Sequence, residues 1–315
     1  GYRARGLARI GIADRVPNGE VTVERTNGRT VLQGGVFHRL RAANEEFGSP
    51  LSFGASLPAL LYGRDEGFYF RAWGAEVSGT RTIGPRASGT GTGVWGWRLF
   101  GERQRSAGDP LGVRNTWSIA RALRDSARFL PNIDAPSLDL VGLELHGSRT
   151  YGLDPDGWRA TTGVRLEGAT GTVAYGRGML DVGASRAVGR ARVAVSGMAG
   201  SSLGDLPIQR HFFVGGARTV RGQVANTQNG NAFWLSRVEL STSARFVRPV
   251  LFFDVGWAGE RENFLKPASI GRVGRPQRGV GLGWSTLDGL FRVDLSRGIA
   301  PQRLWRLDLY LDARL

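Results

Sequence analysis

The sequence predicts an all-β protein, a transmembrane antiparallel β-barrel of about sixteen strands, from three observations. Apolar and polar residues alternate in segments along the whole chain, and turn signals such as Asn27-Gly28 separate these segments. No run approaches the roughly 18 consecutive apolar residues that a membrane-spanning helix needs. The segment 306–315 alternates without interruption, which places its apolar side chains on one face of a strand and its charges on the other.

One alternating strand also fits a soluble sheet, so the prediction depends on how many such segments there are. They recur about every twenty residues, and an even number suits a single-chain barrel with short turns on one rim and longer loops on the other. We expect residues 1–315 to form one barrel domain, closed by pairing of the last strand with the first. The predicted strands lie near residues 2–13, 19–26, 29–43, 49–61, 67–80, 92–104, 114–125, 137–148, 159–170, 172–186, 189–200, 232–246, 249–258, 278–286, 290–298 and 305–315.

The net charge of +15 comes almost wholly from arginine, since Lys266 is the only lysine. It indicates either an anionic partner or solvated arginines in the lumen and loops. The arginines are scattered, with no basic helix or aromatic RNA-binding motif, so we expect no nucleic-acid partner. Nine Trp and six Tyr are enough for aromatic girdles at the two membrane interfaces.

Catalytic and metal-binding readings find little support in the sequence. The absence of Cys excludes thiol catalysis, disulfides and zinc sites with Cys ligands. His38, His146 and His211 do not have a metal-ligand spacing, so we expect no metal and no cofactor. The segment "GVGLG" at 279–283 lacks the helix that would follow in a dinucleotide-binding loop. We therefore expect the protein not to be an enzyme.

One connection carries a specific motif, "HFFVGGARTVRGQ" at 211–223, and two further segments follow it, "LFFDVGWAG" at 251–259 and "GVGLGWSTLDGLFRVDLSRGI" at 279–299. Together they resemble the BamA/TamA outer-membrane assembly-factor superfamily, also called the bacterial surface antigen family. The specific resemblance covers about the last 110 residues, and the earlier part matches in strand rhythm only. Its motif in the sixth extracellular loop corresponds here to Gly215, Gly216, Val220, Arg221 and Gly222.

The resemblance implies that this loop folds back into the lumen, where Arg221 meets carboxylates on the barrel wall. The expected partners are Glu239 and Asp254, which alternate with apolar neighbours and therefore face inward. A guanidinium offers a rigid fork of donors that suits carboxylates. Gln223 stands where the family usually has an aromatic residue, so the aromatic contact at the loop tip is not expected here.

The resemblance also implies a function, which is to insert proteins into the bacterial outer membrane or to translocate them across it. The expected partners are outer-membrane lipids and lipopolysaccharide, client outer-membrane proteins and periplasmic partner proteins. No room exists in this chain for the periplasmic transport-associated domains of the family. Two alternatives stay open, a passive channel that prefers anions and a barrel that anchors a larger complex.

The family mechanism places a weak seam between the first and last strands, which would open laterally and pair with client strands. In this chain the seam would join the segment 2–13 to the segment 305–315. The residues assigned to it are Leu7, Arg9, Leu307, Leu309 and Leu311.

Overall fold

The computed structural model describes residues 1–10, 16–84, 91–108, 118–124, 132–152, 154, 157–242, 247–264, 274–286 and 291–311. Most of these residues are in strands, and most of the strands are long enough to cross a membrane when tilted. The strands are β1 (Tyr2–Ile10), β2 (Pro17–Asn27), β3 (Thr30–Ala42), β4 (Tyr69–Ile83), β5 (Gly93–Ser106), β6 (Leu138–Tyr151), β7 (Arg159–Gly171), β8 (Tyr175–Val188), β9 (Ala191–Gly204), β10 (Phe212–Val214), β11 (Gln228–Gly230), β12 (Ala232–Thr242), β13 (Val247–Gly259), β14 (Gln277–Thr286), β15 (Phe291–Ala300) and β16 (Trp305–Leu311). The helices are α1 (Phe53–Tyr62), α3 (Ile119–Arg124), α4 (Arg261–Phe264) and the short 3-10 helix η1 (Ile208–Arg210).

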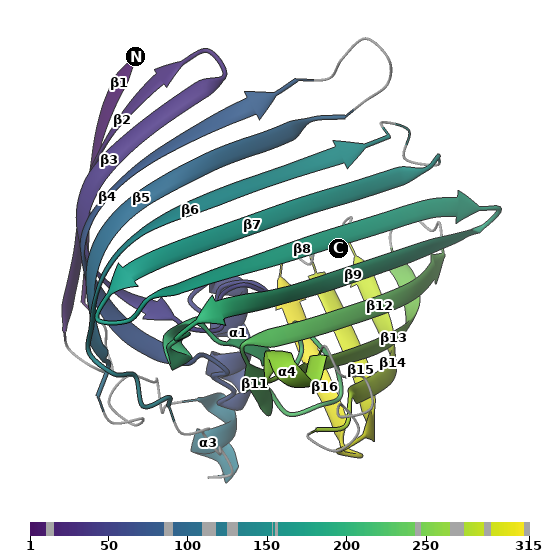
Figure 1. The fold of residues 1–315 in the computed structure, drawn as a ribbon. Helices are drawn as coiled ribbons and strands as arrows, with labels where there is room; N and C mark the ends of the chain where they lie inside the picture. Colours follow the sequence, from purple (N-terminus) through teal and green to yellow (C-terminus); the bar gives the residue numbers. More distant parts are fainter. Residues whose placement is uncertain are drawn as a thin grey trace.

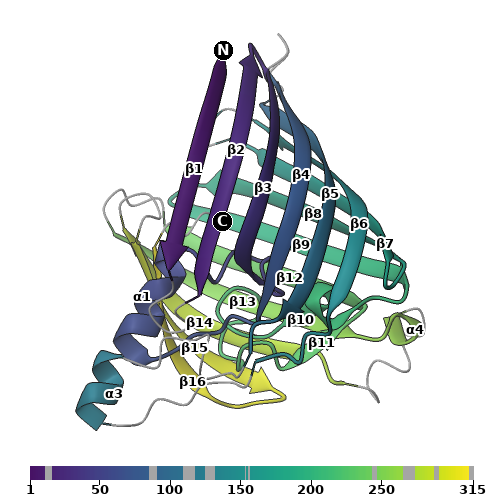
Figure 2. The same cartoon turned by 90° about the vertical axis from the view of Figure 1, so that its left-hand side faces the viewer.

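Fourteen of the strands form one antiparallel sheet that follows the chain order from β1 to β16 and curves into a barrel-like wall (Figures 1 and 2). The other two, β10 and β11, form a separate hairpin inside the connection between β9 and β12. β1 and β16 stand at the two ends of the sheet order, and their predicted pairing stays a prediction. Residues 11–13 and 312–315 of the predicted seam lie outside the described residues.

The total of sixteen strands among the described residues agrees with the prediction, but two of the predicted wall strands are wrong. The segment 49–61 contains helix α1, and the described part of the segment 114–125 contains helix α3. The segment 49–61 is rich in Leu and Ala, and the segment 114–125 is rich in Arg and Ala. Both are poor in the β-branched residues that favour strands, so local propensity favours a helix. The motif connection consequently follows the ninth strand of the wall and not the eleventh, and Asp254 lies on the eleventh and not the thirteenth.

The wall has the two faces that the alternation predicts. Side chains on one face of each strand are large, apolar and exposed, as Val77, Leu99 and Val141 illustrate. Side chains on the other face include many buried charged groups, such as Glu102, Glu167 and Arg292. An apolar exterior around a polar interior is the arrangement of an outer-membrane barrel.

The longer connections gather at one end of the barrel, the lower end in Figures 1 and 2, together with α1, α3, α4 and the β10–β11 hairpin. We call this end the long-connection rim. The strand ends that meet there are those of β3 and β4, β5 and β6, β9 and β12, and β13 and β14, whereas the opposite rim has the tight turns at 28–29 and 189–190. Within the part of the chain that the structure describes, none of the helices is both long enough and apolar enough to cross a membrane.

Candidate functional site in the barrel lumen

The connection between β9 and β12 lies against the inner face of the wall. Its hairpin pairs Phe212 with Gly230 and Val214 with Gln228. The side chains of Phe212, Val214 and Val220 are fully buried, and they pack on Phe233 and Leu235 of β12. The connection therefore folds inward, as the resemblance implied.

Arg221 is the central residue of the site, and the structure brings both of its expected partners to it. Its Nε and Nη2 donate to the two carboxylate oxygens of Asp254, each at 2.6 Å. Its Nη1 donates to Glu239 at 2.6 Å, and its backbone N–H donates to Asp254 at 3.1 Å. The guanidinium also stacks on Phe252, with Cζ 3.6 Å from the ring centroid. The bidentate pair with Asp254 is the strongest geometry available to an arginine and a carboxylate.

Two further residues complete the cluster, and the sequence reasoning missed both of them. Arg292 on β15 donates to Glu239 at 2.9 and 3.1 Å and to Asp294 at 2.8 Å. Asp294 in turn accepts a hydrogen bond of 3.2 Å from Arg221. All five side chains are buried, so two guanidinium groups and three carboxylates pair with each other away from bulk water. We call Arg221, Glu239, Asp254, Arg292 and Asp294 the motif cluster.

The motif lies on a part of the luminal face of β14 that has no side chains. We call the two glycines of this part, Gly279 and Gly281, the glycine lane. Gly279 faces the lumen, and a Cβ atom there would lie 1.8 Å from the carbonyl oxygen of Arg221. A Cβ atom at Gly281 would lie 2.4 Å from the ring of Phe252. The segment that superficially resembled a dinucleotide loop is therefore part of the barrel wall, and its glycines let the motif approach.

The glycines of the motif itself also have steric roles. Gly222 has a φ of 82°, and a Cβ atom there would lie 2.5 Å from the backbone of β15. Gly215 and Gly216 have φ values of 118° and 94°, a region that side chains rarely adopt. The turn that they form is closed by the N–H of Gly215, which donates to the Thr219 hydroxyl at 2.7 Å.

Gln223, the departure from the family pattern, makes amide contacts in place of an aromatic contact. Its Nε2 donates to the carbonyl of Gln302 at 3.0 Å and to the carbonyl of Arg278 at 2.8 Å. Gln302 returns the contact, because its backbone N–H donates to Oε1 of Gln223 at 3.3 Å. The side chain of Gln223 is completely buried. It therefore ties the motif to the connection between β15 and β16.

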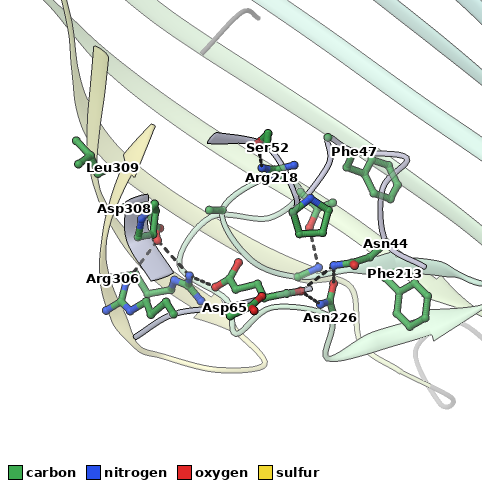
Figure 3. Close-up of a pocket in the computed structure, with 18 residues that line it drawn as sticks. Asn44, Phe47, Ser52, Asp65, Phe213, Arg218, Asn226, Arg306, Asp308 and Leu309 are labelled. Atoms are coloured by element: carbon green, nitrogen blue, oxygen red, sulfur yellow. Dashed lines mark hydrogen bonds and ion pairs between the residues drawn. The ribbon is translucent and has the colours of Figure 1, made fainter. Parts of the chain in front are cut away.

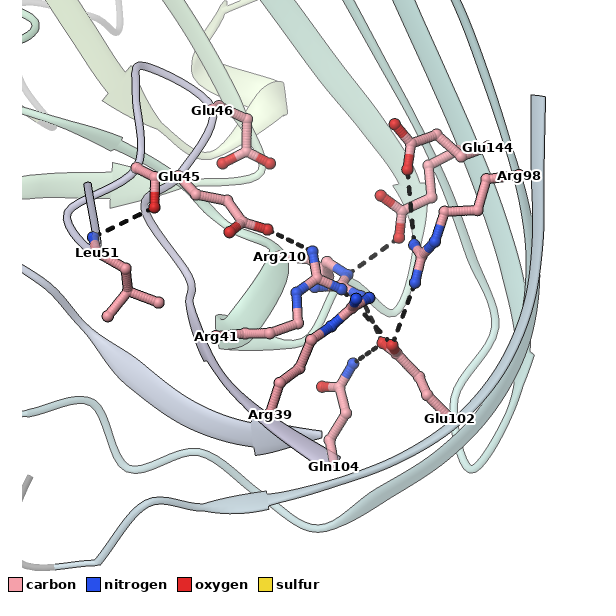
Figure 4. A network of polar contacts seen from close by, with 12 residues as sticks. Arg39, Arg41, Glu45, Glu46, Leu51, Arg98, Glu102, Gln104, Glu144 and Arg210 are labelled. Atoms are coloured by element: carbon pink, nitrogen blue, oxygen red, sulfur yellow. Dashed lines mark hydrogen bonds and ion pairs between the residues drawn. The ribbon is translucent and has the colours of Figure 1, made fainter. Parts of the chain in front are cut away.

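A second buried arginine, Arg210, attaches the N-terminal part of the connection between β9 and β12 to another part of the wall (Figure 4). Arg210 donates to Glu102 on β5 at 2.7 Å and to Glu167 on β7 at 3.0 Å. Tyr175 on β8 donates to Glu167 at 2.7 Å, and Arg177 donates to the carbonyl of Arg210 at 3.0 Å. We call Arg210, Glu102, Glu167, Tyr175 and Arg177 the Arg210 cluster. The connection is thus fixed at two places, to β5–β8 through Arg210 and to β12–β15 through Arg221.

Two charged groups of the connections, Arg210 and Glu45, have pKa values that favour their ionised forms. Burial lowers the pKa of Arg210, but the negative charges of Glu167 and Glu102 outweigh burial, so its pKa lies well above the ordinary value. Burial raises the pKa of Glu45, but the charge and hydrogen bond of Arg41 outweigh burial, so its pKa lies below the ordinary value. Glu45 follows β3 and forms an ion pair with Arg41 (Figure 4).

A third cluster lies between the connection that contains α1 and strand β16, and it lines a cavity of about 120 Å³ (Figure 3). Arg306 contacts Glu66 and lies 3.1 Å from Asp308. Arg306 also donates to the carbonyl of Gln223 at 3.0 Å, which links β16 to the motif. Arg64 lies 3.5 Å from Asp308. We call Arg64, Glu66, Arg306 and Asp308 the edge cluster.

The five seam residues do not share one face. Leu7 and Arg9 lie opposite Glu20 and Asn18 in β2, on the face that carries the luminal charges. Leu307 and Leu309 alternate with Arg306 and Asp308, so they face outward. Leu311 ends β16. Among the described residues there is no group of three or more His, Asp or Glu side chains that could hold a metal ion.

Comparison with known proteins places this geometry in a family context. The sequence model of the Omp85 superfamily domain matches residues 155–302, which include the motif and all of the motif cluster. No curated protein matches the chain by sequence.

Two solved structures share the fold. A BamA from Haemophilus ducreyi that lacks POTRA domains 1-3 superposes with a TM-score of 0.56 at 13% identity, covering 93% of this chain and 60% of its own. CdiB from Acinetobacter baumannii superposes with a TM-score of 0.57 at 15% identity, covering 93% of this chain and 49% of its own. The chain therefore spans about half to three fifths of the length of these proteins, and the shared part is the barrel.

Proposed function

We propose that this chain, which belongs to the Omp85 superfamily of outer-membrane proteins, inserts proteins into the bacterial outer membrane or translocates them across it. The observation that carries the proposal is the bidentate contact of Arg221 with Asp254 inside the motif cluster. It fixes the long connection to the part of the wall that ends at β16. A loop fixed in the lumen next to a terminal strand suits a barrel whose wall opens, and not one whose lumen conducts freely.

The state of the luminal arginines also favours this function over a passive anion channel. A channel that prefers anions needs cationic side chains that are open to the permeating ion. In the described part of the lumen, Arg210 and Arg221 are buried and bound to carboxylates. Arg39 and Arg98 each lie 2.8 Å from Glu76. These ion pairs cancel much of the positive charge that the sequence alone would assign to a pore.

The proposed mechanism uses the two terminal strands of the sheet order as a seam. Opening between β1 and β16 would expose backbone N–H and C=O groups, and an incoming strand could pair with them. Client outer-membrane proteins and periplasmic proteins that deliver them are the proposed partners. Cysteines that cross-link Leu7 to the facing part of β16 should abolish insertion if the seam opens, whereas full activity of the locked protein would exclude lateral opening.

The function can be tested with the purified chain in lipid vesicles and an unfolded eight-stranded outer-membrane protein as the client. We expect the chain to speed client folding, and Arg221→Ala to reduce this acceleration by about tenfold or more, because the buried cluster would lose its main cation. Arg218→Ala, three positions earlier in the same connection, is the matched control and should retain activity. A chain that leaves client folding unchanged and conducts a steady anion-selective current would instead be a channel. A chain that does neither would be a membrane anchor.

A further inference from the structure

Helix α1, in the connection between β3 and β4, has a sequence without charged residues. Its ten residues read FGASLPALLY. The helix packs against β16, yet the side chain of Leu60 is 39% exposed. An apolar helix of this length is too short to cross a bilayer and is typically buried in a protein core or embedded in a membrane interface. The exposure of Leu60 favours the membrane interface.

One side of α1 borders the polar cavity of the edge cluster. Pro58 of the helix lines this cavity together with Arg306 and Asp308, which project from the luminal face of β16 (Figure 3). Residues two positions apart in an α-helix point about 200° apart, so Leu60 points away from the cavity. Figure 2 shows α1 at the left margin of the barrel, on the side where the sheet order ends. The helix therefore has a polar region on its inner side and an apolar surface on its outer side, as a wall strand has.

The helix lies at the level of the apolar band of the wall. On the outer face of β15, the apolar run ends at Leu295, and the exposed Arg297 follows. Trp305 of β16 lies opposite Arg297, with its ring centroid 5.3 Å from the guanidinium carbon, and Trp is typical of the membrane interface. Leu309, which lines the same cavity as Pro58, is four residues further along β16. Four strand residues span about 13 Å, or about 9 Å along the membrane normal at a tilt of about 45°, so α1 reaches below the headgroups.

We propose that α1 contacts the acyl chains of the outer leaflet and forms part of the membrane-facing wall beside β16. Leu307 faces outward on β16 and is 44% exposed, so the lipid-facing surface of the strand continues onto the helix that packs against it. The longer connections of outer-membrane barrels are extracellular, so the leaflet is the outer one. Arg64, directly after the helix, donates to the carbonyl of Leu307, which gives this backbone group a polar partner at a level where lipid offers none.

The test places a spin label on α1 and measures by electron paramagnetic resonance which relaxation reagent reaches it in lipid vesicles. Because the chain has no Cys, Leu60→Cys provides a single labelling site. Leu145→Cys, on the outer face of β6, is the lipid reference, and Asn27→Cys, beside the tight turn at 28–29, is the water reference. Oxygen dissolves in hydrocarbon and a nickel chelate dissolves in water. We expect oxygen to reach the label at Leu60 more readily than the chelate does, as at Leu145, and the reverse at Asn27.

Two results of this measurement would overturn the proposal. A label at Leu60 that the nickel chelate reaches more readily than oxygen would mean that α1 lies in water. A label that neither reagent reaches would mean that a protein surface covers the helix. The measurement needs no client protein, so its outcome is independent of the function proposed above.

A charge at the same position provides a second measurement. A lysine on the lipid-facing surface is unfavourable within the apolar band and nearly neutral close to the interface. Leu60→Lys should therefore lower the folding equilibrium constant in vesicles, measured by urea titration, by about tenfold or more. The matched control is Leu203→Lys, because Leu203 is an exposed residue at the end of β9 beside the long-connection rim. The control should lower the constant by about fivefold at most, and equally small effects of the two lysine variants would also overturn the proposal.

Discussion

The guanidinium of Arg64 donates a hydrogen bond of 2.8 Å to the backbone carbonyl of Leu307. This carbonyl points away from β15, because the N–H of Gly298 bonds to the carbonyl of Leu304 and orientation alternates along the strand. Arg64 follows helix α1, which also packs against β16. The connection between β3 and β4 thus occupies backbone positions that a partner strand of β16 would use.

Removing the hydrogen bond between Arg64 and Leu307 should make the side of β16 that faces away from β15 more accessible. In Arg64→Ala, we expect faster deuterium uptake by the amides of 305–311, measured by hydrogen-exchange mass spectrometry, because the helix loses its polar attachment to the strand. Arg165→Ala is a close control. Arg165 has 41% side-chain exposure and lies 3.6 Å from Glu144, whereas Arg64 has 40% exposure and lies 3.5 Å from Asp308. Equal uptake in the two variants would mean that Arg64 does not protect the strand.

The motif cluster should contribute strongly to stability. Arg221→Ala leaves Asp254 and Glu239 buried without their main cation, and breaking a buried pair in this way costs about 3–5 kcal/mol. Arg221→Lys should rescue only part of this, since an ammonium cannot make the bidentate contact. We expect a lower temperature of band loss in gel electrophoresis and faster proteolysis of residues 205–231. Arg218→Ala should change stability by less than about 1 kcal/mol. Unchanged heat resistance of Arg221→Ala would contradict the role assigned to the cluster.

The connection between β9 and β12 is attached to the wall through Arg210 and Arg221, and these two attachments should act together in closing the lumen. Arg210 keeps its charge at any accessible pH because the surrounding carboxylates raise its pKa despite burial. In planar bilayers we expect small, flickering currents from the wild-type chain and from Arg210→Ala or Arg221→Ala alone. The double variant should give a larger and steadier current, because the connection then loses its charged attachments to both parts of the wall. A large steady current from the wild-type chain would show that the connection does not obstruct the lumen.

The strands were predictable where alternation and composition agree. At 191–195 and 291–295 the two signals coincide, and both segments form strands. At 49–61 the alternation is present, but Ala and Leu dominate and favour a helix, so alternation alone gave the wrong element. The strand and helix propensities of the residues, taken together with the apolar–polar alternation, would have separated these cases.

The sequence predicted which face of a strand carries the site residues. It did not predict the register of neighbouring strands, which brings these residues together. Alternation places Glu239 and Asp254 inward, and the family resemblance supplies Arg221 as their partner. Alternation also places Arg292 and Asp294 inward, but their height relative to Arg221 depends on the stagger of three strands, which no local pattern encodes. The contacts of Arg210 span up to 108 positions in sequence, so only the curvature of the wall brings them together.

The connection after β3 should loosen in acid. The pKa of Glu45 is lowered from 4.5, so the Arg41–Glu45 pair stabilises the fold above pH 4.5, and this contribution is lost as pH falls through the lowered folded value. Because the chain has no Cys, Ser49→Cys provides a single site for a spin label. We expect electron paramagnetic resonance to report an immobile label at pH 7 and a label that becomes mobile as the pH falls through the lowered pKa of Glu45. In Glu45→Gln the label should be mobile throughout this range, and a label that stays immobile in that variant would exclude the pair as the cause.

The glycine lane of β14 should be as important as the charges that it accommodates. In Gly279→Ala the new methyl group would lie 1.8 Å from the carbonyl oxygen of Arg221, which is backbone and cannot swing away. The motif must then shift out of register with Asp254, so we expect a loss of stability of about 1–3 kcal/mol or more, together with faster proteolysis of 205–231. Gly101→Ala is the matched control, because a Cβ atom at this strand glycine meets nothing within 4 Å. If both variants melt at the wild-type temperature, the motif has enough freedom to move off the lane, and close packing on β14 is not what holds Arg221 in place.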